Sequence, residues 1–457
     1  MEAERLSALD ASFLAVEGPS TPMHVGWVAR LDVPEDEPRP DHGAIYAHIA
    51  DRLSGATRYR QQLAGIPFGL HQPVWVDDPG FDPARHVLHA PGDDLDPIVD
   101  GILSTPLPRD RPLWEIHVAD ELADGIALVG KMHHCMVDGV AIAELGNRLL
   151  DREPGGWQEP KADGDGWNAA PAPSRRERLA RAMADRAADG VAIALAPARL
   201  ATSPARVRAL PAAASRGARS AGHTLLPPAP GSPLNRPGSA RRRHIRVTRS
   251  LDDIRTVRRR FGVTPNDVVL AACTGALRRF AERRGEPPQR LKAMVPADVR
   301  SSEDAAGSGN RIAFLFIALP CDEPDPVARL LAISRATTQR RADGVAEDID
   351  AAFRALSLTP RPFQQALAQA FGHPRLFNLT VSSVPGPAVP RYLRGCRLRE
   401  VHSAVPLPGR HALSIGVVTV ARQACFGLYA DADTLPDADG LAADLDEALD
   451  ELLDAQG

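Results

Sequence analysis

The chain alternates between two hydrophobic periods, one typical of strands and one typical of amphipathic helices. Residues 23–31 and 126–134 predict strands, and residues 43–53 predict a helix. Further elements of the same two kinds are expected at residues 95–103, 113–118, 264–282, 291–295, 312–319, 377–382, 412–420 and 441–453. This mixture predicts an α/β fold in which mixed sheets are flanked by helices.

Two helix starts carry their own capping signals. Ser250 with Asp253 resembles a capping box that opens a short helix. Thr264 is followed by Pro265 and by Asp267, which places a cap, a first-turn proline and a first-turn acid in the preferred order. We therefore expect a strong helix to begin at Pro265.

The pattern breaks between the two halves of the chain. Gly, Pro, Asp and Ala dominate residues 153–173, and residues 174–249 hold sixteen arginines, no lysine and three acids. This composition predicts an N-terminal domain (1–155), a partly helical Pro/Ala/Arg-rich linker (156–244) and a C-terminal domain (245–457). A basic helix over residues 175–196 is either a solvated connector or a segment that lies on an anionic membrane surface.

Composition excludes several classes of function. The formal net charge of -4 over 457 residues gives no nucleic-acid signature. Five scattered cysteines without a CxxC pair argue against a disulfide framework and a cysteine-based zinc site. The charged N-terminus does not resemble a signal peptide, and no apolar run approaches 18 residues. We expect a cytoplasmic protein that contacts a membrane or lipid-droplet surface peripherally, if at all.

A pair of histidines ends the predicted strand at residues 126–134. His133 and His134 are followed by three residues and then by Asp138 and Gly139. A histidine at a strand end can serve as a general base, because its ordinary pKa lies near neutral pH. Adjacent strand residues point to opposite faces, so one of the two is expected to be structural. A metal site is a third interpretation, although neighbouring strand positions converge poorly on one ion.

The His-His-x-x-x-Asp-Gly pattern resembles that of acyltransferases with the chloramphenicol acetyltransferase fold. Six further motifs stand in register with it, and together they resemble the bacterial wax ester synthase/diacylglycerol O-acyltransferase family over residues 6–435. They are residues 6–25 (LSALDASFLAVEGPSTPMHV), 112–115 (PLWE), 232–235 (SPLN), 265–267 (PND), 309–311 (GNR) and 378–387 (NLTVSSVPGP). The resemblance implies two acyltransferase-like domains with the active site in the cleft between them.

The resemblance also implies roles for the residues around the histidines. His134 occupies the position of the general base, and His133 that of a supporting residue. Asp138 is the anchor of the loop, with Arg300 as its candidate partner, and Gly139 leaves room at the turn. No metal or cofactor is implied, because acyl-CoA enters as a substrate whose phosphates basic side chains can hold.

Other positions carry two explanations each. Asn266 and Asp267 match a motif associated with activity, but polar residues in a first helical turn also favour the helix dipole. The residues expected to bind substrate or the oxyanion are Asn266, Asp267, Ser382 and Ser383. The residues expected to support the site structurally are Pro112, Leu113, Trp114, Arg300 and Asn310.

The expected reaction moves a long-chain fatty acyl group from acyl-CoA to the hydroxyl of diacylglycerol or of a long-chain alcohol. Two features depart from the family pattern: Ser383 replaces the usual Asn, and residues 296–300 read PADVR in place of Pro-Val-Ser-Val-Arg. Two alternatives therefore stay open. One is a condensation-type acyltransferase that uses carrier-protein thioesters, and the other is a lipid-surface binding protein with reduced turnover.

Overall fold

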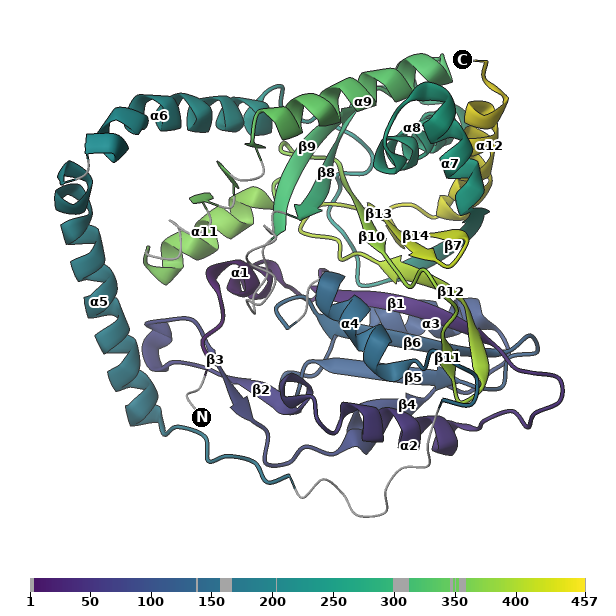
Figure 1. Cartoon of the computed structure of the whole chain (residues 1–457), viewed down its shortest axis with the longest axis horizontal. Helices are drawn as coiled ribbons and strands as arrows, with labels where there is room; N and C mark the ends of the chain where they lie inside the picture. The colour runs from purple at the N-terminus through teal and green to yellow at the C-terminus, as the bar shows by residue number, and fades with distance from the viewer. Residues whose placement is uncertain are drawn as a thin grey trace.

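Two six-stranded sheets form the framework of the molecule. The computed structural model describes residues 4–136, 139–156, 167–202, 204–298, 312–345, 348–349, 351–352 and 359–456. One sheet lies in the lower half of Figure 1 and the other in the upper half, and both are flanked by helices. Each sheet has its own hydrophobic core of buried aliphatic side chains. This is the mixed α/β arrangement that the two hydrophobic periods predict.

The lower sheet has the strand order β11-β12-β1-β6-β5-β4. Helices α2 and α4, in the lower half of the molecule, pack against each other. Helix α3 contacts strand β6. The elements of this half are α1 (Ala8–Val16), β1 (His24–Asp32), α2 (His42–Leu53), η1 (Thr57–Arg60), β2 (Gln61–Ala64), η2 (Pro67–Gly69), β3 (Val74–Asp77), η3 (Pro83–Arg85), β4 (Val87–His89), α3 (Leu95–Ser104), β5 (Trp114–Ala119), β6 (Ile126–His133) and α4 (Gly139–Leu149).

The upper sheet has the strand order β7-β14-β13-β10-β8-β9. Helices α7, α8, α9 and α12 pack together beside it. The elements after the linker are β7 (Arg242–Ser250), α7 (Leu251–Phe261), α8 (Pro265–Arg283), β8 (Leu291–Asp298), β9 (Ile312–Leu319), α9 (Pro326–Ala342), α11 (Arg361–Phe371), β10 (Leu379–Pro385), β11 (Tyr392–Leu393), β12 (Cys396–Ala404), β13 (Leu413–Val420), β14 (Gln423–Asp431), η4 (Ala438–Gly440) and α12 (Leu441–Asp454).

Strand β12 joins the two halves. It comes from the C-terminal part of the chain, yet it pairs antiparallel with β1 in the lower sheet, with Val28 opposite His402. Its far side contacts β13 and β14 of the upper sheet. Side chains at Gly416 and Gly427 would overlap Ser403 of β12, so these two glycines permit the close approach of the sheets. The N-terminal sheet is therefore completed by residues from beyond position 390.

The two predicted helix starts have different outcomes. Thr264 and Asp267 form a complete capping box at α8, as predicted. The capping box predicted at Ser250 is wrong in its partner, because the Ser250 side chain accepts from the backbone N–H of Asp252. Asp253 pairs instead with Arg249, at 3.4 Å. The preceding strand β7 holds Arg249 within reach, and this ion pair replaces the contact back to the cap.

Two long helices, α5 (Arg175–Ala201) and α6 (Pro204–Leu225), run along one edge of the molecule (Figure 1). The predicted basic helix is thus present. Ala182 of α5 is buried against β3, and Arg186 donates to the carbonyl oxygens of Leu70 and Thr359. The end of α6 is held by Lys292, whose ammonium group donates to the carbonyl oxygen of Thr224. Among the described helices, none is long and apolar enough to cross a membrane.

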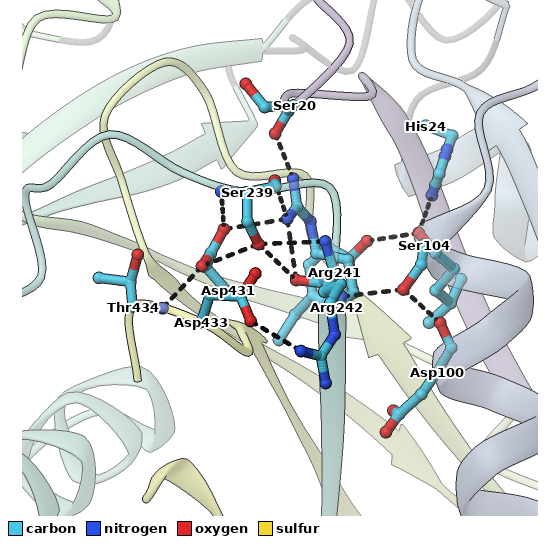
Figure 2. A network of polar contacts seen from close by, with 12 residues as sticks. Ser20, His24, Asp100, Ser104, Ser239, Arg241, Arg242, Asp431, Asp433 and Thr434 are labelled. Carbon is cyan, nitrogen blue, oxygen red and sulfur yellow. Dashed lines mark hydrogen bonds and ion pairs between the residues drawn. The ribbon is translucent and has the colours of Figure 1, made fainter. Parts of the chain in front are cut away.

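A buried polar network fastens the arm before β1 to the upper sheet (Figure 2). Arg242 is paired with Asp431 at 3.2 Å, and both side chains are almost completely buried. The same guanidinium donates to the carbonyl oxygen of Ser20 in the N-terminal arm, and the Arg242 backbone N–H donates to Ser104 at the end of α3. One arginine therefore connects the N-terminal arm, α3 and the C-terminal half.

Candidate active site

Backbone hydrogen bonds fix the two histidines at the end of β6. The N–H of His133 donates to the carbonyl oxygen of Leu113, over 2.9 Å. On the other side, the N–H of His134 donates to the carbonyl oxygen of Met23, also over 2.9 Å. The Pro-Leu-Trp segment thus holds His133, and the N-terminal arm holds His134. Two motifs that are far apart in sequence meet at one strand end.

His133 is sealed inside the protein, with a side-chain exposure of 1%. Its Nδ1 accepts from the backbone N–H of Cys135 at 3.1 Å, which leaves the proton on Nε2. That Nε2 faces the Glu17 carboxylate at 3.4 Å. Burial, together with the nearby Arg109 cation, lowers the pKa of His133 to about 3. His133 is therefore a neutral, oriented residue at neutral pH.

Glu17 holds this arrangement together, and its role was not predicted from the sequence. One carboxylate oxygen faces His133 and also accepts from the backbone N–H of Met23, at 3.1 Å. The other oxygen is ion-paired with Arg109. The one signal in the sequence is its position inside the quoted N-terminal motif, six residues before Met23. Pattern alone does not show which distant groups such a carboxylate contacts.

His134 has a different environment. It is half-buried, and its imidazole stacks on the ring of Phe13 from α1, with 3.9 Å between centroids and 8° between planes. Phe13 belongs to the same N-terminal motif as Glu17. The N-terminal arm thus fixes the orientation of both histidine rings. The ring of Phe13 orients His134, and the carboxylate of Glu17 orients His133. The two imidazoles are structurally unequal, and His134 is the more accessible of the two.

Trp114 braces the sheet behind the histidines. Its side chain is buried, and its indole N–H donates to the carbonyl oxygen of Tyr59 over 2.8 Å. The ring also stacks on His86 at 4.6 Å between centroids. Leu113 is buried as well, and Pro112 precedes β5. These contacts are those of a packing residue.

The end of α3 supports β1 and β6 from the opposite face. His24, which pairs with His133 across β1 and β6, contacts the Leu103 carbonyl oxygen through Nε2 at 3.1 Å. The Tyr429 hydroxyl donates to the same oxygen at 3.0 Å, so this carbonyl links the upper sheet to the strand beside the histidines (Figure 2 shows His24 next to Ser104). Burial lowers the pKa of His24 to about 3 and keeps its ring neutral.

Asn266 and Asp267 lie in the first turn of α8, in the upper half. Asp267 is completely buried, and both of its oxygens have partners: one accepts from the Thr264 backbone N–H at 2.9 Å and the other from the Thr337 hydroxyl at 2.7 Å. These bonds account for Asp267 as a residue that fixes the start of α8 against α9. Asn266 is half-buried.

Ser382 and Ser383 lie on β10, and β10 contacts α4, the helix that follows the histidine loop. Ser382 is half-buried and Ser383 is exposed. Gly139 is the first residue of α4. The predictions for Asp138, Arg300 and Asn310 lie outside the described residues. Within the described part of the chain, no group of three or more His, Cys, Asp or Glu is arranged to hold a metal ion.

Two family matches extend across most of this framework. Residues 6–269 match the wax ester synthase/diacylglycerol acyltransferase catalytic domain, and residues 308–453 match the WS/DGAT C-terminal domain. The chain belongs to this family. The resemblance inferred from the motifs is thereby confirmed, and with it the expectation of an O-acyltransferase.

Relatives agree over nearly the whole length. A protein of Mycobacterium tuberculosis is 35% identical over 476 residues, which cover 99% of this chain and 90% of the relative. A second protein of the same organism, named as a probable diacylglycerol O-acyltransferase, is 32% identical and covers 98% of this chain and 95% of its own.

Solved structures show the same architecture. The wax ester synthase/diacylglycerol acyltransferase from Marinobacter aquaeolei VT8 is 27% identical, has a TM-score of 0.68 and covers 98% of both chains. The first condensation domain of the calcium-dependent antibiotic synthetase is 16% identical, with a TM-score of 0.60, and covers 99% of this chain and 96% of its own. This second likeness concerns the fold. The predicted fold class, two chloramphenicol-acetyltransferase-like domains, is confirmed.

Proposed function

We propose that the protein transfers a long-chain fatty acyl group from acyl-CoA to the hydroxyl of diacylglycerol or of a long-chain alcohol, with His134 as the general base. Family membership supports the reaction class. The observation that supports the choice of base is the inequality of the two imidazoles. His133 is sealed and has both ring nitrogens directed at protein groups, whereas His134 is half-buried at the strand end.

In the proposed reaction, His134 takes the proton from the acceptor hydroxyl. The resulting oxygen attacks the thioester carbonyl, and the tetrahedral intermediate collapses as the carbon–sulfur bond breaks. The CoA thiolate then takes the proton back from His134. One base suffices because a thiolate is a good leaving group. His133, Glu17 and Phe13 act as positioning residues, because they hold the orientation of the loop and of the reacting imidazole.

We assign stabilisation of the oxyanion to hydrogen-bond donors from the upper half of the molecule. The Asn266 amide and the hydroxyls of Ser382 and Ser383 have the chemistry that is needed, since each can donate a hydrogen bond. The Asp267 carboxylate does not, and its oxygens already accept two hydrogen bonds. We therefore remove Asp267 from the proposed oxyanion donors and keep it as a structural residue.

Free-thiol release from palmitoyl-CoA tests the reaction. The acyltransferase account predicts that diacylglycerol or a long-chain alcohol accelerates release above the rate without an acceptor, and chromatography then separates triacylglycerol from wax ester. No acceleration by any of several alcohols would contradict it. A protein that binds vesicles but releases no thiol would support the lipid-surface alternative, and transfer only from carrier-protein thioesters would support the condensation-type one.

We also propose that α5 and the neighbouring η2 turn contact the lipid phase that supplies the acceptor. Phe68 is 94% exposed and has a left-handed backbone, with φ at 59°. Met183 and Phe363 are each 58% exposed, and contacts of Arg186 with Leu70 and Thr359 bring their segments together. Exposed apolar side chains beside arginines are typical of a surface that lies on anionic lipid.

Flotation with vesicles that contain anionic lipid tests this surface. Point substitutions are sharper than deletion of α5, because deletion would remove the buried Ala182. The variants Phe68→Glu and Met183→Glu should float less than the parent, while Val389→Glu, which changes an exposed apolar residue in the loop after β10, should float equally well. Equal flotation of all four proteins would contradict the proposal.

A further inference from the structure

A pocket of about 860 Å³ opens on the N-terminal half, between the end of α2, the η1 turn and α4. Its lining includes Arg52, Arg58, Tyr59, Met136, Leu145 and Arg148. The volume lies in the range of roughly 300–1,000 Å³ that is usual for pockets that hold cofactor-sized ligands. We call it the α2–α4 pocket.

The α2–α4 pocket reaches the histidine loop. Met136, in its lining, is two residues from His134, a backbone distance of at most about 7 Å. Arg58 lines the same pocket as Met136, and its cation acts to lower the pKa of the neighbouring Cys135 thiol. That thiol is nevertheless kept protonated by burial, which raises its pKa. A ligand in the pocket would therefore sit beside the proposed base without occupying its position.

Three guanidinium groups from three separate elements line the pocket: Arg52 from α2, Arg58 from η1 and Arg148 from α4. Two carboxylates, Asp51 and Glu144, also line it. Arg52 is ion-paired with Asp151, and Arg58 with Glu4, and neither carboxylate belongs to the lining. Such pairs hold a guanidinium in place and still leave part of its five N–H donors for another acceptor.

Apolar groups stand beside these charges. Leu145 and Ala56 are buried, and Tyr59 presents an aromatic side chain that is 9% exposed. A ligand that suits this lining carries several phosphate oxygens and a flat aromatic ring. Both belong to the nucleotide end of CoA. The donor of the proposed reaction thus has one end that matches the pocket and another that must reach His134.

We propose that the α2–α4 pocket binds the 3′-phosphorylated adenosine diphosphate end of acyl-CoA. Arg52, Arg58 and Arg148 are the hydrogen-bond donors to its phosphate groups. The pantetheine arm then runs along Met136 toward His134. This inference rests on the proposed function, because it assigns a place to the donor of that reaction. It predicts that donor affinity depends on one face of α4 and on the turn after α2.

The test compares two donors that differ only in the nucleotide. Arg58→Gln and Arg148→Gln are assayed with palmitoyl-CoA and with the palmitoyl thioester of N-acetylcysteamine. Loss of one charge-assisted hydrogen bond to phosphate weakens binding roughly tenfold or more. We expect KM for palmitoyl-CoA to rise by about that factor with kcat within twofold of the parent, and KM for the nucleotide-free thioester to stay unchanged. The matched control is Arg85→Gln, which removes a surface guanidinium outside the pocket.

Titration calorimetry with CoA itself gives a second readout that does not depend on turnover. Weaker CoA binding in the two pocket variants, with the control unchanged, supports the site even if the parent transfers acyl groups to no alcohol tested. That result would contradict the proposed acyltransferase function but would still support the CoA site. Equal CoA affinity in the parent and both pocket variants, or equal KM increases for both donors, would overturn the site while leaving acyl transfer intact.

Discussion

The imidazole of His134 stacks on the phenyl ring of Phe13, with centroids 3.9 Å apart and planes within 8°. Phe13 comes from α1, more than a hundred residues before His134 in the chain. The contact places the N-terminal arm in the framework of the candidate active site. A parallel stack of this kind restricts ring rotation, and a general base depends on its orientation toward the proton that it accepts.

Phe13→Leu should therefore lower kcat by roughly tenfold while KM for both substrates stays near the parent value, because the change frees the imidazole without altering a substrate contact. Phe13→Tyr keeps the aromatic face and should keep most of the activity. Steady-state kinetics on the two variants decides this. Equal kcat for Leu and Tyr at this position would show that the stack does not matter.

Glu17→Gln should lower kcat by roughly tenfold to a hundredfold, because the loss of charge leaves Arg109 without its carboxylate partner and loosens His133. The amide oxygen can still accept from Met23, so the fold should persist. The matched control is Glu35→Gln, at an exposed position outside the site. If both variants keep parental kcat, Glu17 is not a positioning residue.

Asp267→Asn separates the two explanations of the Asn266–Asp267 motif. An amide cannot replace both of the acceptor oxygens that serve Thr264 and Thr337. We expect the free energy of unfolding to fall by roughly 2 kcal/mol and kcat per folded molecule to stay close to the parent. Urea unfolding measures the first quantity, and steady-state kinetics at equal folded concentration measure the second. A large loss of kcat with unchanged stability would instead give Asp267 a direct part in the reaction.

Stability should fall as the pH drops below neutral, partly because of buried neutral histidines. Burial, together with the Arg246 cation, lowers the pKa of His244 to about 3, whereas an unfolded histidine titrates near 6.5. Between these values the unfolded chain binds more protons, so protonation favours unfolding as the pH falls. Each such group contributes up to about 1.4 kcal/mol per pH unit.

The variant His244→Gln isolates this contribution. Its free energy of unfolding should depend less steeply on pH between about 4 and 6.5 than that of the parent, by close to one proton. Urea titrations at several pH values measure the slope. Identical slopes for the two proteins would mean that His244 is protonated to the same extent in both states.

Elements that depend on neighbouring residues could be predicted from the sequence, whereas elements that depend on long-range pairing could not. The start of α8 was predictable because Thr264, Pro265 and Asp267 act within one turn. Strand β6 was predictable because its apolar run is buried on both faces. Strand β12 was not, since its membership in the lower sheet depends on β1, some 370 residues earlier by number, and on two glycines in β13 and β14.

The site shows the same division. An unequal pair of histidines was predicted from strand geometry and from the family resemblance, and the environments of His133 and His134 differ. The arginine triplet that begins at Arg241 falls inside the predicted linker (156–244), yet Arg242 is buried with Asp431. Glu17 was equally hidden from pattern analysis. For both Arg242 and Glu17 the partner lies far away in sequence, and the charge of the residue does not show which partner it will have.

The most direct test of the account is acceptor-dependent thiol release by His134→Ala, measured against the parent at equal folded concentration. A positioned general base typically contributes about 10² to 10⁴ to a rate. We predict a loss of roughly 10³ in kcat, with an unchanged melting temperature and unchanged binding of CoA. Retention of acceptor-dependent release within tenfold of the parent would contradict the assignment of His134 as the base.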